Sequence, residues 1–424
     1  MDYAGWLVAV GAMLVAIYAT SHVVARMPAS PALVYLVIGM AIGPLGFGWV
    51  DPDPARHAAL IEHAAELAIL VSLFATGSVV GTTLRVEHWR VPVRLASFAM
   101  VATIALLAAF AYFVLGLSPG ASLVLAGALA PTDPVLAGDV QVDDERDRDR
   151  LRFGLTGEAG LNDGAAFPFV AAGLALLGLE SGGSEGVVAW VARSAWSVIA
   201  AIAIGASLGL AAATWVGKRL REGIESEASE SFLGLGLVAV SYGLALFVDA
   251  YGFLAVFGAA VTLQWSLAGE GARGAGAGRE SATKETAMAP IHQFNADLES
   301  LFEFALVIAC GVLVTVVPIP LATIALSLAL FLIIRPASVM LAMIGTPLGA
   351  EQRALASWFG IRGVGSLYYV FYALTHGWRG QEADYVLGLV LGVIAASVVV
   401  HGVSVTPLMH AYERHRSLGG RRRA

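Results

Sequence analysis

Long apolar stretches with only short interruptions are the feature that most limits how this chain can fold. Of its 424 residues, 58% are hydrophobic and 13% are charged, whereas about a quarter of a soluble domain is charged. Because a transmembrane helix needs roughly 20 apolar residues, the sequence predicts an all-α polytopic membrane protein with about 13 spans and argues against a water-soluble enzyme. We expect spans at residues 4–25, 31–49, 60–83, 92–116, 121–141, 152–179, 188–216, 231–249, 251–268, 296–316, 319–345, 354–375 and 384–410.

The positions of lysine and arginine predict the orientation. With alternating spans, about 20 of the 25 basic residues lie on the side of the C-terminus and about 3 on the other, and basic loops stay in the cytoplasm. We therefore expect a multi-pass protein in the lipid of the cell membrane, with the N-terminus outside and the C-terminus in the cytoplasm. Residues 269–290 are rich in Gly, Ala and charge and predict a flexible cytoplasmic linker. Residues 413–424 form a basic cytoplasmic tail.

Composition also limits the expected partners. The net charge of −7 argues against nucleic acid. The single cysteine, Cys310, excludes a disulfide framework and a thiolate metal site, and it fits a small core residue. We expect no resident cofactor.

Asp133 is a charged residue at membrane depth, where ionisable groups are costly and usually functional. It lies in LAGALAPTDPVLAGDV, between Pro131 and Pro134. Each proline lacks an amide donor and disfavours helical geometry in the preceding residue, so we expect this span to unwind. Unwound backbone in a membrane must be buried or line a wet cavity, where carbonyl and carboxylate oxygens suit a small cation. Taken alone, the motif fits equally well a proline kink capped by Thr132 and Asp133.

The following span contains LTGEAGLNDGAAFPFV. Glu158 and Asn162 are four residues apart and share a helix face, and Asp163 lies one position further round the helix. Hydrogen bonding between helices would account for Asn162, but a buried carboxylate also requires a cation. Asp163 is therefore the main candidate for a group that binds a cation and a proton.

Arg362 supplies a balancing charge in WFGIRGVGSLYY, where Gly360, Gly363 and Gly365 loosen a second span. The alternative is an arginine at a cytoplasmic helix end. Arg335 and Glu303 fall near the ends of predicted spans, and we expect each to extend to the membrane interface or to be paired there.

The two interrupted spans occupy matching positions along the chain. Each is the second of three spans, within 92–179 and 319–410, and one span at 188–216 separates two six-span units. Because the second unit begins after an odd number of spans, it is inverted in the membrane relative to the first. Interrupted helices at matching positions of inverted halves indicate a transporter site at the membrane midplane. We therefore expect two membrane halves, at 1–268 (first repeat 1–179, connecting span 188–216, start of the second repeat 231–268) and at 291–412.

The motifs APTDP (Ala130–Pro134), GEAGLNDG (Gly157–Gly164) and FGIRG (Phe359–Gly363) resemble those of the monovalent cation:proton antiporters, and of the NhaP-like sodium/proton branch in particular. Their order and spacing agree along nearly the whole chain. The resemblance implies an NhaA/NhaP-like fold of two inverted six-helix repeats with crossing interrupted helices. It also implies a homodimer with an ion-translocating core at 92–179 and 319–410, a dimerisation part in the remaining helices, and elevator-like movement of the core.

Matched residue by residue, the resemblance implies that Asp163 binds cation and proton in turn beside Asn162, and that Thr132 and Asp133 line the crossing. The transported Na⁺ would lie at Asp163 and Thr132. Other residues would have structural roles: a core-stabilising ion pair of Glu158 with Arg362, and helix breaks at Pro131, Pro134 and Gly363.

The Asn-Asp pair implies electroneutral Na⁺/H⁺ exchange, with K⁺/H⁺ antiport as the alternative. Two departures leave the preference among Na⁺, K⁺ and Li⁺ open: Ala75 or Thr76 where several members of the branch are acidic, and Ala159 where some carry a hydroxyl. Less favoured alternatives are a passive cation channel and an intramembrane aspartyl protease using Asp133 and Asp163.

Overall fold

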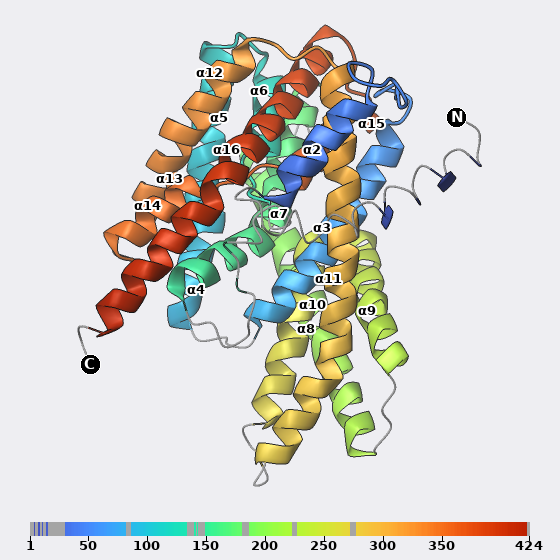
Figure 1. Cartoon of the computed structure of the whole chain (residues 1–424), viewed down its shortest axis with the longest axis vertical. Helices are drawn as coiled ribbons and strands as arrows, with labels where there is room; N and C mark the ends of the chain where they lie inside the picture. The colour runs from blue at the N-terminus through green and yellow to red at the C-terminus, as the bar shows by residue number, and fades with distance from the viewer. Residues whose placement is uncertain are drawn as a thin grey trace.

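The computed structural model describes residues 4, 7, 8, 11, 14, 15, 30–81, 86–133, 140, 142, 149–179, 186–222, 227–271 and 277–421. The secondary structure of these residues is helical, and they contain no β-strand (Figure 1). Within them, seven helices are long and apolar enough to cross a membrane, and five shorter apolar helices accompany these. The predicted all-α polytopic fold is therefore confirmed. Most of the first expected span, 4–25, lies outside the described residues.

The helices follow the expected spans, with most ends shifted by several residues and larger shifts at the start of α11 and at the end of α16. The first half of the chain forms α2 (Pro31–Ile42), α3 (Ala58–Val80), α4 (Val86–Arg94), α5 (Met100–Phe113), α6 (Pro119–Leu129), α7 (Arg150–Leu176) and α8 (Val187–Arg221). The second half forms α9 (Glu227–Phe247), α10 (Gly252–Gly271), α11 (Ala277–Val316), α12 (Ala322–Ala329), α13 (Arg335–Ala342), α14 (Ala350–Trp358), α15 (Val364–Thr375) and α16 (Gln381–Arg421).

Two spans contain a short π-helical turn near a proline. Leu95–Ala99 joins α4 to α5 shortly after Pro92, and Leu330–Ile334 joins α12 to α13 just before Pro336. Proline removes a donor and crowds the carbonyl four residues earlier, so Pro336 accounts for the turn that contains Leu332, whereas Pro92 acts on the backbone before its turn. Each of these spans is the first of its group of three, so the irregularities occur at matching positions in the two halves.

The segment 269–290 differs from the expected flexible linker. α10 continues to Gly271 and α11 begins at Ala277, and residues 272–276 lie outside the described residues. Ala, Arg, Glu and Lys are frequent after Ala277 and are strong helix formers. The helix therefore continues beyond the apolar part of the span, although the sequence there has no apolar face.

The helices form two groups (Figure 1). One contains α4, α5, α12, α13, α14 and α16, and the other contains α2, α3, α8, α9, α10 and α11. Small residues bring helices of the second group close together, since a Cβ at Gly39 of α2 would lie 2.2 Å from the carbonyl oxygen of Ile308 in α11. A Cβ at Gly205 of α8 would lie equally close, 2.2 Å, to the carbonyl oxygen of Ala255 in α10.

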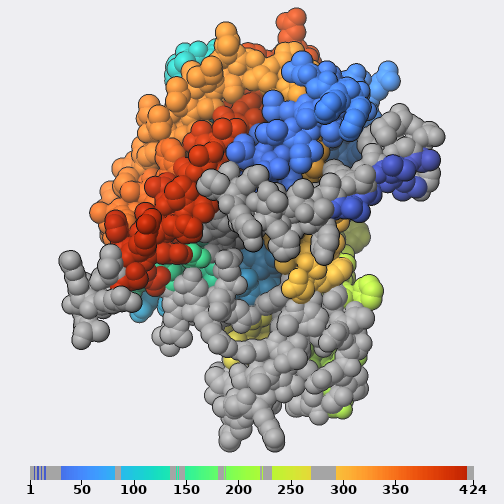
Figure 2. Space-filling model, in the orientation of Figure 1, coloured from blue at the N-terminus to red at the C-terminus, as the bar shows by residue number. Residues whose placement is uncertain are grey.

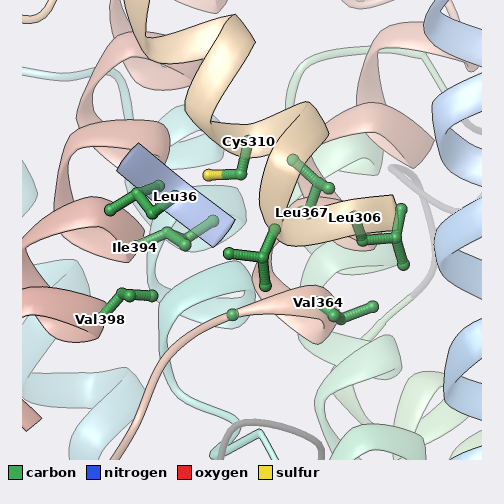
Figure 3. Close-up of a pocket in the computed structure, with 9 residues that line it drawn as sticks. Leu36, Leu306, Cys310, Val364, Leu367, Ile394 and Val398 are labelled. Atoms are coloured by element: carbon green, nitrogen blue, oxygen red, sulfur yellow. The ribbon is translucent and has the colours of Figure 1, made fainter. Parts of the chain in front are cut away.

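A small apolar pocket lies where the two groups meet (Figure 3). Figure 2 shows the same junction from outside, with α2 in blue beside α16 in red. Cys310 lines the pocket and is buried, as expected of a small core residue. The lining comes from α2 and α11 on one side and from α15, α16 and the residue before α15 on the other: Leu36, Leu306, Val307, Cys310, Gly363, Val364, Leu367, Ile394 and Val398.

Candidate functional site

The two interrupted spans meet where their prolines and glycines predict. α6 ends at Leu129 and the chain is not helical at residues 131–133, while α14 ends at Trp358 and α15 begins only at Val364. The amide of Asp133 donates to the carbonyl of Ile361 at 2.9 Å. Backbone groups that lose their helical partners thus pair across the crossing, as groups buried from water must. Pro134 lies outside the described residues.

Asp133 caps a helix at this crossing. Its carboxylate accepts a hydrogen bond from the amide of Val364, the first residue of α15, and its side chain is buried. The first amides of a helix have no partner within it and carry partial positive charge, so a carboxylate is stabilised there. One of the two candidate carboxylates therefore has a structural partner, which does not suit the paired acids of an aspartyl protease.

Arg362 is fully buried and holds the unwound end of α6. Its Nη1 donates to the carbonyl of Pro131 at 2.7 Å, and its backbone amide donates to Oγ of Ser397 at 2.8 Å. Ser397 lies on α16, where its hydroxyl is 3.1 Å from Nδ1 of His401. Neither Ser397 nor His401 was predicted, because both lie within an apolar span without a motif.

The partner of Glu158 differs from the expected one. Arg335, and not Arg362, binds the Glu158 carboxylate through two hydrogen bonds, Nη1 to Oε1 at 2.6 Å and Nη2 to Oε2 at 2.8 Å. Both side chains are almost completely buried, with 3% and 2% exposed. Arg335 also donates to the carbonyl of Ala356 at 3.3 Å, so it links α7 to the last turn of α14. The expected place of Arg335 at the membrane interface is therefore wrong, and the signal that could have shown its role is that it falls ten residues inside the 319–345 span.

Thr132 and Asn162 join the two motifs of the first half. Nδ2 of Asn162 donates to Oγ1 of Thr132 at 2.7 Å and lies 3.4 Å from its carbonyl oxygen. Both side chains are buried, and Oδ1 of Asn162 has no hydrogen-bond partner in the described part of the chain. An amide oxygen is thus left available beside the crossing.

Asp163 is the buried acid without a polar partner. Its side chain is 1% exposed, and neither carboxylate oxygen has a hydrogen-bond partner among the described residues. It faces the backbone of α15, since a Cβ at Gly365 would lie 2.8 Å from Oδ1 of Asp163. Tyr369, one turn along α15, donates its hydroxyl to the backbone carbonyl of Asp163. Gly365 leaves space next to the carboxylate of Asp163. Tyr369 holds α15 against α7, the helix that carries Asp163.

Comparison with known proteins agrees with this geometry. The sequence profile described as "Sodium/hydrogen exchanger, transmembrane" matches residues 10–411. The chain belongs to the sodium/hydrogen exchanger family. The expected resemblance to cation:proton antiporters is therefore confirmed.

A solved structure extends the comparison to the fold. The sodium proton antiporter MjNhaP1 from Methanocaldococcus jannaschii, solved at pH 8, superposes with a TM-score of 0.70 at 17% identity, covering 96% of this chain and 98% of that one. A second structure of the same protein gives the same TM-score. The NhaP-like arrangement of helices is thus shared along nearly the whole length.

Two yeast proteins of this family match over shorter segments. "Na(+)/H(+) antiporter 2" of Zygosaccharomyces rouxii is 27% identical over 227 residues, and "Na(+)/H(+) antiporter" of Saccharomyces cerevisiae is 27% identical over 159 residues. The matched segments cover 51% and 37% of this chain but only 28% and 16% of those proteins. This chain thus corresponds to a minor part of the length of either relative.

Proposed function

We propose that this protein is a secondary active transporter that exchanges Na⁺ for H⁺ across the membrane, with both ions competing for Asp163 and no resident cofactor. The observation that carries this proposal is a buried carboxylate without a hydrogen-bond partner among the described residues, next in sequence to Asn162, whose amide oxygen is also without one. An ionised carboxylate in such a place is costly, whereas a bound proton or a bound cation neutralises it. The site then moves across the membrane easily only with a proton or a cation bound to Asp163. This requirement couples the flux of Na⁺ to the flux of H⁺.

The number of free carboxylates supports an electroneutral exchange. Of the three acids in the two motifs of the first half, Asp133 is engaged by the amide of Val364 and Glu158 is neutralised by Arg335, so Asp163 remains as the acid that changes its ligand. One proton exchanged for one monovalent cation moves no net charge. Carboxylate, amide and carbonyl oxygens are hard ligands suited to Na⁺, and Thr132 and Asn162 would complete the shell around Asp163.

The arrangement in the membrane follows from the same proposal. The distribution of basic residues supports a cell-membrane protein with the N-terminus outside and the C-terminus in the cytoplasm. We assign the ion-translocating core to residues 92–179 and 319–410, and a homodimer interface to the remaining helices. α8 supports this assignment, because it is the least buried of the seven long spans and exposes large apolar residues such as Trp196, Ile199 and Ile202.

The test uses purified protein in liposomes that contain a pH-sensitive dye. Addition of Na⁺ should produce a pH change that is absent in Asp163→Asn and retained in the control Asp51→Asn, which removes an exposed carboxylate from a loop. The rate should not change when a voltage is imposed with a potassium ionophore. Normal exchange by Asp163→Asn would refute the role of this residue, and a faster response to K⁺ than to Na⁺ would favour the K⁺/H⁺ alternative.

A further inference from the structure

A second set of polar side chains enters the membrane between α3 and α11. Oγ of Ser72 on α3 donates to Oε1 of Glu299 on α11 at 2.6 Å. The two helices run antiparallel, so Thr76, one turn beyond Ser72, lies at the level of Asn295, one turn before Glu299. One observed contact, Ser72 with Glu299, thus lies one helical turn from two further polar residues, Thr76 on α3 and Asn295 on α11.

This polar set is buried and incompletely satisfied. Ser72, Thr76 and Asn295 are buried, with Asn295 only 1% exposed, and Glu299 is partly buried. In the part of the chain that the structure describes, Oδ1 of Asn295 has no hydrogen-bond partner. A buried acceptor without a donor destabilises a protein unless a ligand or water satisfies it. An electron-rich oxygen is thus available one helical turn from a carboxylate.

The set lies next to the helix crossing. About two turns beyond Glu299, Leu306 of α11 lines the apolar pocket together with Gly363 and Val364 of the second helix break. The charge of Asp133 also repels that of Glu299. Since α3 ends and α11 begins on the same side of the membrane, a row from Asn295 to Glu299 leads from that side toward the crossing. The proposed orientation makes this the cytoplasmic side.

We propose that Glu299, Ser72 and Asn295 form a second site for a monovalent cation, on the side of the crossing where α3 ends and α11 begins. Their carboxylate, hydroxyl and amide oxygens are hard ligands that suit a partly dehydrated alkali cation. The site rests on the proposed exchange function and deepens it, because it would attract the cation before the cation reaches Asp163. Several members of the NhaP-like branch have an acidic residue on α3 where this chain has Ala75 and Thr76. The carboxylate of Glu299 on α11 lies near this part of α3.

The first test measures exchange from each side of the membrane. In liposomes with oriented full-length protein, Glu299→Gln should raise the apparent KM for Na⁺ on the α11 N-terminal side about tenfold, the effect of losing one charge-assisted contact. The maximal rate and the KM on the other side should stay within about twofold of the wild type. Asp297→Asn is the matched control, because it removes an exposed carboxylate of the same helix that accepts a hydrogen bond from the exposed Gln293. An unchanged KM in Glu299→Gln would overturn the proposal.

Equilibrium binding of radioactive Na⁺ separates this site from the one at Asp163. Asp163→Asn should still bind Na⁺, and Asp163→Asn with Glu299→Gln should not. Loss of all binding in Asp163→Asn alone would overturn the second site, while continued exchange by that variant would refute only the proposed transport role of Asp163. Ser72→Ala gives a further check if Glu299→Gln does not fold, since it should weaken the remaining binding in the Asp163→Asn background.

Discussion

Removal of the Glu158 carboxylate is expected to destabilise the protein by about 3–5 kcal/mol, because it leaves the Arg335 guanidinium buried without its counter-charge. The size follows from the burial of the pair: both side chains are at most 3% exposed, and two of the hydrogen bonds of Arg335 go to Glu158. Its remaining bond, to the carbonyl of Ala356, does not neutralise the charge. Glu158→Gln is the conservative change for this test.

Two further variants separate the buried charge from packing. Replacing both partners with methionine removes the charges and keeps apolar volume, so the double variant should recover most of the stability that Glu158→Gln loses. Glu413→Gln breaks the pair of Glu413 with Arg152, whose side chains are 52% and 16% exposed, and a pair this exposed is worth about 1 kcal/mol or less.

The assay is thermal unfolding of detergent-solubilised protein, followed by intrinsic tryptophan fluorescence. Unfolding of a membrane protein is often irreversible, so the variants are compared at a single heating rate. We expect the apparent melting temperature of Glu158→Gln to lie well below those of the wild type, the double variant and Glu413→Gln. If the double variant melted as low as Glu158→Gln, the loss would come from packing and the argument from buried charge would be refuted.

Three other predictions concern the crossing and the exchange cycle. Gly365→Ala would bring a Cβ to 2.8 Å from Oδ1 of Asp163. The exchange assay in dye-loaded liposomes should therefore show at least about tenfold weaker Na⁺ affinity. Gly349→Ala, whose Cβ would have no neighbour closer than 3.9 Å, is the control. Asp133→Asn keeps an oxygen that can cap α15, so it should retain more exchange and a higher melting temperature than Asp133→Ala, which loses about 0.5–2 kcal/mol of capping; equal variants would argue against the cap. Acid protonates Asp163, so the KM for Na⁺ should rise up to about tenfold per unit of falling pH below the pKa of that carboxyl group and become constant above it; a constant KM throughout would refute competition.

Local chemistry made the helix breaks predictable. Pro131 and Gly363 act on the backbone beside them, so both unwound segments could be predicted from the sequence. Asp163 could be predicted to lie near them, because it is in the span that follows the first break. The partner of Glu158 was not predictable in the same way. Arg335 and Arg362 both lie in the second half of the chain, and the choice between them depends on how α13 and α14 pack against α7.

Helix ends were the other source of error. Glu299 lies close to the expected start of a span at residue 296, where an acidic residue would normally face water. In the structure α11 begins at Ala277, and Glu299 contacts Ser72 of α3. A hydropathy pattern records where apolar residues begin, but it does not record how far a polar helix continues beyond them or what packs beside it.

The apolar pocket between the two groups of helices has a consequence for motion. Three hydrogen-bonded pairs of the site do not cross this pocket: Asn162 with Thr132 and Glu158 with Arg335 lie on one side of it, and Ser72 with Glu299 lies on the other. Sliding along the apolar surface would exchange some van der Waals contacts for others of similar energy and would break none of these hydrogen bonds. Apart from the hydrogen bond of the Ser30 amide to the Gly402 carbonyl, at 2.8 Å, the resistance to sliding would then come from the charge state of Asp163, so that the ion carried by the protein would also determine how freely it moves.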